Sequence, residues 1–153
     1  MNKAETVKHL HSAKKAHLKW VHRAKALIEG LPIEKEAIPV ACTECQFGQW
    51  FYGEGESLNT IVGKDALSEI ETLHFNLHDM YMKIFKVYFG DIERSFFSKL
   101  FNLKKSVSES DKEMARNYYE QLSVISYQLI DVIDKLERRL HAMSSDTFDE
   151  SMA

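Results

Sequence analysis

Proline, glycine and cysteine are scarce in this chain of 153 residues, which has two prolines, six glycines and two cysteines. The chain therefore has few helix breakers and too few thiols for a disulfide framework. No run approaches the roughly 18 apolar residues of a transmembrane helix, and the N-terminus lacks the apolar core of a signal peptide. These absences favour a cytoplasmic helical protein with reduced thiols and no membrane insertion.

An excess of charge of either sign is also missing. The 20 basic and 23 acidic residues are mixed along the chain and give a formal net charge of −3. This balance provides neither a nucleic-acid footprint nor a basic patch for a lipid surface. A glycine-rich phosphate loop and a serine-hydrolase elbow are absent too, so the sequence shows no motif of these enzymes.

What the sequence has in abundance is helix-forming residues with helical periodicity. Gly30 and Pro32 end the first periodic segment, because glycine caps a helix and proline cannot continue one. Four long segments follow the period of an α-helix: residues 3–29, 64–89, 92–107 and 111–142. We therefore predict an all-α fold, like a four-helix bundle.

The length suits one domain. Ser110 and Glu113 form a capping-box pattern where the last helix is expected to begin. We assign the bundle to residues 1–143. Residues 144–153 are small and acidic with a single aromatic residue, so we predict a disordered tail.

The last predicted helix carries apolar residues at alternating spacings of four and three, which is a heptad seam. Its members are Tyr118, Leu122, Ile125, Leu129, Val132 and Leu136. Such a seam favours packing against neighbouring helices of the same bundle. It is also able to pair two chains, so a homodimer is a further expectation.

A short extra helix is expected around Cys45. Thr43 and Gln46 have the spacing of a capping box, which places Cys45 in the first helical turn, where the helix dipole favours a thiolate. Three aromatic residues at helical spacing would fix this helix on the bundle: Phe47, Trp50 and Phe51.

Three histidines have the phase of inward-facing residues. His17 lies in the middle of the first apolar stripe, and His74 and His78 lie one turn apart on the long central helix. Each feature alone is common in helical cores, but Cys45 completes a set. One thiolate and three neutral imidazoles suit tetrahedral Zn²⁺, and four protein ligands leave no open position for catalysis.

These residues resemble the chemoreceptor zinc-binding domain family, or CZB. The resemblance extends over roughly residues 3–89 and rests on three motifs in the same order as in the family. They are His17 with Trp20, then Cys45 with Gly48 and Trp50, then His74 with His78. Cys42 lies outside the family motif and is either inert or a resolving thiol for Cys45.

The resemblance implies a helical bundle that binds zinc and regulates chemoreceptors or diguanylate cyclases, some members sensing hypochlorous acid through the zinc-bound cysteine. It therefore implies a zinc-binding sensory or regulatory protein of bacterial signalling, of chemotaxis or cyclic-di-GMP type, without enzymatic activity. Unlike in typical members, we expect no output domain in this chain. The expected partner is a signalling protein on which it acts in trans.

Two other readings remain open from the residues. A hemerythrin-like di-iron bundle that binds oxygen fits the length, the helicity and the paired histidines, although it requires bridging carboxylates and further inward histidines. A helical interaction module with histidines as core residues needs no metal.

Overall fold

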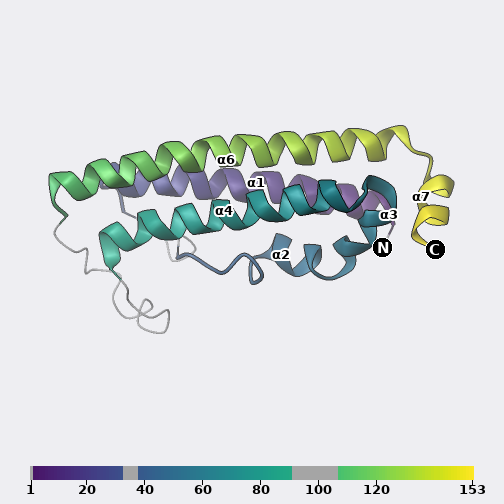
Figure 1. Ribbon diagram of the computed structural model, residues 1–153, viewed down its shortest axis with the longest axis horizontal. Helices are drawn as coiled ribbons and strands as arrows, with labels where there is room; N and C mark the ends of the chain where they lie inside the picture. Colours follow the sequence, from purple (N-terminus) through teal and green to yellow (C-terminus); the bar gives the residue numbers. More distant parts are fainter. Residues whose placement is uncertain (1, 33–37, 91–106) are drawn as a thin grey trace.

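Three long helices lie side by side in the computed structural model, which describes residues 2–32, 38–90 and 107–153 (Figure 1). They are α1 (Lys3–Ile28), α4 (Lys64–Phe89) and α6 (Glu109–Ala142). The shorter elements are α2 (Gln46–Phe51), the 3₁₀ helix η2 (Glu54–Leu58), α3 (Asn59–Val62) and α7 (Ser145–Met152). The prediction of an all-α bundle with a short extra helix at the cysteine is confirmed. Of the helix expected over residues 92–107, residues 92–106 lie outside the described residues, and residue 107 is not helical.

The ends of α1 follow from local chemistry. Asn2 accepts a hydrogen bond from the Glu5 backbone N–H, and the Glu5 side chain accepts one from the Asn2 backbone, which completes a capping box. Gly30 follows the helix with φ of 77°, a conformation that residues with a Cβ rarely adopt. The predicted stop at Gly30 is therefore confirmed.

The apolar core lies between the inner faces of the three long helices. On α4, nine of the buried residues follow the period of one helical face. These residues are Leu67, Ile70, His74, Leu77, His78, Tyr81, Ile84, Phe85 and Tyr88. The helical period alone therefore determines which side chains of α4 point inward.

α6 holds the other two long helices in place. It packs extensively along α4 and along α1, whereas α1 and α4 contact each other much less. Leu122, Leu129 and Leu136 of the heptad seam are buried in this packing. The heptad seam therefore packs against helices of the same chain. Self-association through this seam stays a prediction.

An ion-pair network also joins α6 to α1. The Lys14 ammonium group contacts the carboxylates of Asp134 and Glu137, and both Lys14 and Glu137 are largely shielded from solvent. On the opposite side of the α1 and α4 pair from α6 run α2 and the short elements that follow it (Figure 1).

Two sequence predictions at the ends of α6 are wrong. Ser108, not Ser110, caps the helix, because Ser108 has extended backbone angles and its hydroxyl accepts the Asp111 N–H. Residues 144–153 are not a disordered tail: Ser144 caps α7, and Phe148 is fully buried. Burial of one large aromatic side chain against the bundle, with α7 contacting α3 and α1, supplies the free energy that orders this segment.

None of the helices within the described residues combines the length and the apolar composition needed to cross a bilayer.

Replacement of Phe148 tests whether α7 is docked. Phe148→Ala should lower the free energy of unfolding by about 3 kcal/mol, because it removes a fully buried aromatic ring. Phe75→Ala is the matched control, since Phe75 is 57% exposed, and should change stability by less than about 0.5 kcal/mol. Urea denaturation measures both, and equal stabilities would contradict the docking of α7.

Candidate metal centre

Cys45 is the N-cap of α2. Residues 41–44 form a separate turn in which the Ala41 carbonyl accepts the N–H groups of Glu44 and Cys45. The backbone of Cys45 is extended, and its sulfur accepts the N–H of Gly48 at 3.2 Å. The predicted capping box between Thr43 and Gln46 is therefore wrong, because the sulfur itself occupies the capping position.

Gly48 is required by a close approach of the backbone. A Cβ at this position would lie 1.8 Å from the carbonyl oxygen of Cys42, well inside van der Waals contact. The same Cys42 carbonyl lies 3.4 Å from the Cys45 sulfur. Gly48 therefore fixes the position of the sulfur in two ways, by donating its N–H and by admitting the preceding turn.

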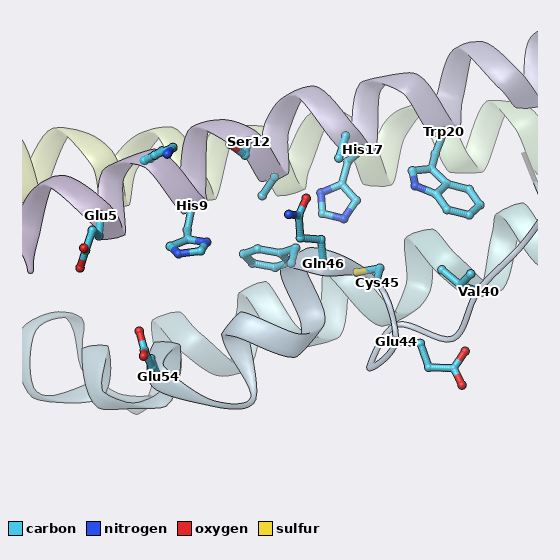
Figure 2. Close-up of a pocket in the computed structure, with 14 residues that line it drawn as sticks. Glu5, His9, Ser12, His17, Trp20, Val40, Glu44, Cys45, Gln46 and Glu54 are labelled. Carbon is cyan, nitrogen blue, oxygen red and sulfur yellow. The ribbon is translucent and has the colours of Figure 1, made fainter. Parts of the chain in front are cut away.

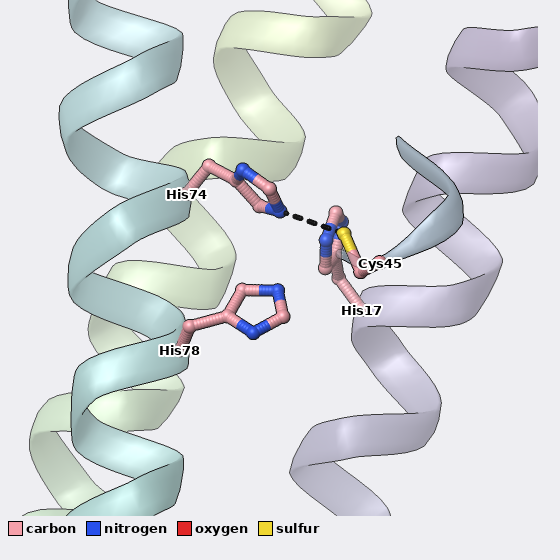
Figure 3. A group of neighbouring side chains, drawn as sticks. All are labelled: His17, Cys45, His74 and His78. Carbon is pink, nitrogen blue, oxygen red and sulfur yellow. Dashed lines mark hydrogen bonds between the residues drawn. The ribbon is translucent and has the colours of Figure 1, made fainter. Parts of the chain in front are cut away.

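The three histidines reach the same place from two long helices. His17 on α1 is 1% exposed, and His74 and His78 on successive turns of α4 are 0% and 7% exposed. Figure 3 shows their rings converging on the Cys45 sulfur from both sides. All four residues predicted from the sequence are thus brought together, and α6 contributes none of them.

The ligand atoms of these four side chains all lie within 4.8 Å of one another. The Cys45 sulfur and His74 Nε2 are 3.3 Å apart. Tetrahedral coordination of Zn²⁺, with bonds of about 2.3 Å to sulfur and 2.0–2.1 Å to nitrogen, places pairs of ligand atoms roughly 3.3–3.6 Å apart. The cluster is therefore close to the size that a tetrahedral zinc site requires.

The imidazole rings pack edge to face rather than in parallel. Ring centroids are 4.9 Å apart for His17 and His74, and 4.7 Å apart for His74 and His78. The Phe47 ring contacts the His17 and His74 rings edge-on, and the ring centroids of Trp20 and His78 are 5.5 Å apart. These aromatic side chains cover part of the cluster with apolar surface.

Hydrogen bonding orients His78 toward the cluster. Its Nδ1 lies 2.9 Å from the Val40 carbonyl oxygen, a contact that fixes the proton on Nδ1 and leaves Nε2 as a lone-pair donor. His78 Nε2 is buried and has no hydrogen-bond partner among the described residues. His17 Nδ1 and His74 Nδ1 are likewise buried without hydrogen bonds of ordinary geometry.

The electrostatics keep the imidazoles neutral. Burial lowers the pKa of His17 to about 3, helped by nearby His78 and opposed by the Ala13 carbonyl. Burial also lowers the pKa of His74 to about 2, with His17 and His78 adding to the effect. The pKa of His78 is lowered by burial too, against the Val40 carbonyl. Neutral imidazoles are the form that binds metal.

The sulfur of Cys45 behaves differently from the sequence-based expectation. Burial raises the pKa of the Cys45 thiol, and the N–H groups of Gly48 and Phe47 offset only part of that rise. The helix start alone therefore does not favour a thiolate here. A cation beside the sulfur would reverse the balance, because a coordinated thiol loses its proton.

Zn²⁺ fits this donor set. The cluster offers one sulfur and three buried nitrogen-bearing rings at suitable separations, and some of the buried nitrogens lack any other partner. No carboxylate belongs to the cluster, and no second group of this kind occurs in residues 2–32, 38–90 and 107–153. A di-iron centre, which needs bridging carboxylates, therefore finds no support in this part of the chain.

The geometry defines a helical zinc-binding domain, and sequence comparison agrees. Residues 17–85 match the family model described as the chemoreceptor zinc-binding domain, CZB. This part of the chain is a CZB domain, which confirms the resemblance seen in the three motifs. The match begins at His17 and ends in α4, so α6 and α7 lie outside it. No curated protein and no solved structure shows significant similarity to the chain.

Sequence reasoning found the ligand side chains and missed two backbone groups that position them. For the N–H of Gly48, the only clue in the sequence was that a glycine stands three residues after Cys45. The carbonyl of Val40 has no sequence signal, because any residue at that position offers the same group.

Gly48→Ala should weaken zinc binding by roughly 10–100-fold, the usual cost of losing a group that positions a ligand. The new Cβ must push the Cys42 turn away and take the sulfur with it. Gln49→Ala is the control, because Gln49 is exposed on the same short helix. Competition with a chelator of known affinity measures both variants, and equal affinities would remove Gly48 from the positioning of Cys45.

Proposed function

We propose that this chain is a zinc-binding sensory or regulatory protein of bacterial signalling, of chemotaxis or cyclic-di-GMP type. One observation carries the proposal: three buried histidines and one cysteine, from three elements, place their ligand atoms within 4.8 Å of one another. The family to which residues 17–85 belong is described as chemoreceptor-associated. A signalling role is therefore the best-supported use of such a site.

The donor set favours regulation over catalysis. Bound zinc supplies a positive charge that keeps Cys45 as a thiolate. The four protein ligands complete its tetrahedral coordination. The protein residues fill every position, with His78 held by Val40 and Cys45 held by Gly48. A closed site leaves no place for a reactive water molecule, so the proposed protein is not an enzyme.

The site acts mechanically on the side of the bundle away from α6. It joins α1, the start of α2 and α4, while α1 and α4 have few direct contacts with each other. The spacing of these two helices on this side therefore depends on a small set of contacts, which includes the ligand side chains and the packing of Trp20 on Tyr81. A change at one ligand alters a surface that a partner signalling protein reads in trans.

Cys45 is the ligand suited to change. It is only partly buried, whereas the three histidines are buried. Hypochlorous acid oxidises a cysteine thiolate to the sulfenic acid and releases chloride, and the product is a much poorer ligand. Loss of Cys45 from the site would detach the start of α2 from the other three ligands. Zinc depletion and oxidation of Cys45 therefore have the same effect on α2.

Metal analysis of protein purified without a metal-affinity tag tests the zinc site. The wild-type protein and Cys42→Ala should each hold one zinc ion per chain, while Cys45→Ala should lose most of it because a strong anionic ligand is gone. Cys42 is a close control, since it lies three residues away and outside the cluster. Equal zinc content in the two variants would sink the assignment. Metal-free wild-type protein would instead favour a metal-independent interaction module.

Oxidation of the zinc-loaded protein tests the sensor role. An equimolar amount of hypochlorous acid should release zinc to a chromogenic chelator, and mass spectrometry should find oxygen on Cys45. The Cys42→Ala variant should release zinc to the same extent if Cys45 alone responds. Oxidation confined to methionines or Cys42, with all zinc retained, would make the site a purely structural element.

A further inference from the structure

A pocket of about 960 Å³ lies between α1 and the chain around α2 (Figure 2). On the α1 side its wall includes the small residues Ser12, Ala13 and Ala16, and on the other side Val40, Gln46 and Phe47. We call this space the α1–α2 pocket.

The α1–α2 pocket reaches the metal centre. His17 and Cys45 both line it, whereas His74 and His78 do not. Figure 2 shows the Cys45 sulfur and the His17 ring partway along the pocket, with His9 and Glu54 toward one end and Trp20 and Val40 toward the other. Since Cys45 is the partly buried member of the cluster, its sulfur is the first ligand atom that a molecule in the pocket meets.

The end of the pocket at Glu5 and Glu54, which we call its mouth, is acidic. Glu5 and Glu54 approach from opposite walls near His9, and Glu44 lies beside Cys45 (Figure 2). Lys8 is the single basic residue among the lining side chains apart from histidine. The mouth therefore carries a negative potential, which raises the local concentration of cations and lowers that of anions.

We propose that the α1–α2 pocket is the route by which zinc ions and small metal-binding molecules reach Cys45 and His17. The inference rests on the proposed zinc function and adds the control of exchange. His74 packs against Phe47 and His78 against Trp20, and His17 and Cys45 are the two ligands that line the pocket. The pocket thus sets the rate of exchange, while the four ligands set the affinity.

Filling the pocket separates rate from affinity. Ala16→Leu places a larger side chain in the channel without touching a ligand, and leucine is a good helix former. Lys15→Leu is the matched control, because Lys15 is exposed on the same helix and does not line the pocket. Transfer of zinc to excess chromogenic chelator, followed by stopped flow, should be roughly tenfold slower in Ala16→Leu. The control should match wild type, and all three proteins should hold one zinc per chain.

A second readout needs no metal. In zinc-free protein carrying Cys42→Ala, a small uncharged maleimide should alkylate Cys45 more slowly when Ala16→Leu is present than when Lys15→Leu is present. If wild-type protein holds no zinc, the proposed function fails while this alkylation experiment still tests the pocket. The two proposals are therefore distinguishable.

Ionic strength tests the acidic mouth. Zinc uptake by the apo protein should slow as salt rises, because screening weakens the attraction of cations to the carboxylates. Glu5→Gln combined with Glu54→Gln should remove most of that dependence. A rate independent of salt in the wild-type protein would overturn the role of charge in entry.

The proposal as a whole is overturned by unchanged rates of transfer and alkylation in Ala16→Leu protein that retains its zinc and its helicity. If Ala16→Leu loses zinc or helicity, Ser12→Leu is the second variant, since Ser12 lies one helical turn further from His17 and is exposed. Wild-type rates in that variant overturn the proposal equally.

Discussion

The constraint on which this structure depends is the burial of four polar ligand groups at one point. A buried nitrogen without a hydrogen-bond partner costs free energy, and His78 Nε2 is such an atom in this cluster. Each imidazole has a pKa lowered by burial, so protonation cannot satisfy them at neutral pH. A single divalent cation bound by all four would satisfy them at once. The buried side chains of Phe47, Trp50 and Phe51 pack α2 against the bundle.

The fold and the ligand set were largely readable from the sequence because both depend on helical phase. His17 shares the phase of Leu10 and Val21, and His74 and His78 share that of Ile70 and Tyr81, so burial of the stripe forces the histidines inward. The cap positions were less predictable. Ser108 and Ser110 both have the right chemistry, and only the actual path of the chain into α6 distinguishes them.

The remaining features depend on contacts between distant parts of the chain, which no local pattern encodes. Phe148 orders α7 because the bundle offers a buried site for one ring, and residues 144–153 alone do not reveal that site. Val40 positions His78 through a backbone carbonyl, which every residue type possesses. The raised pKa of Cys45 has the same origin. It reflects burial by neighbouring elements that outweighs a favourable helix start.

The sparse contact between α1 and α4 has a geometric consequence for the whole bundle. Apolar packing on α6 fastens these helices along one side, and the ligand side chains and the contact of Trp20 with Tyr81 fasten them on the other. An opening of the two helices on that second side is therefore opposed by few contacts. Because each of these 26-residue helices is about 40 Å long, such an opening alters their separation along its full length.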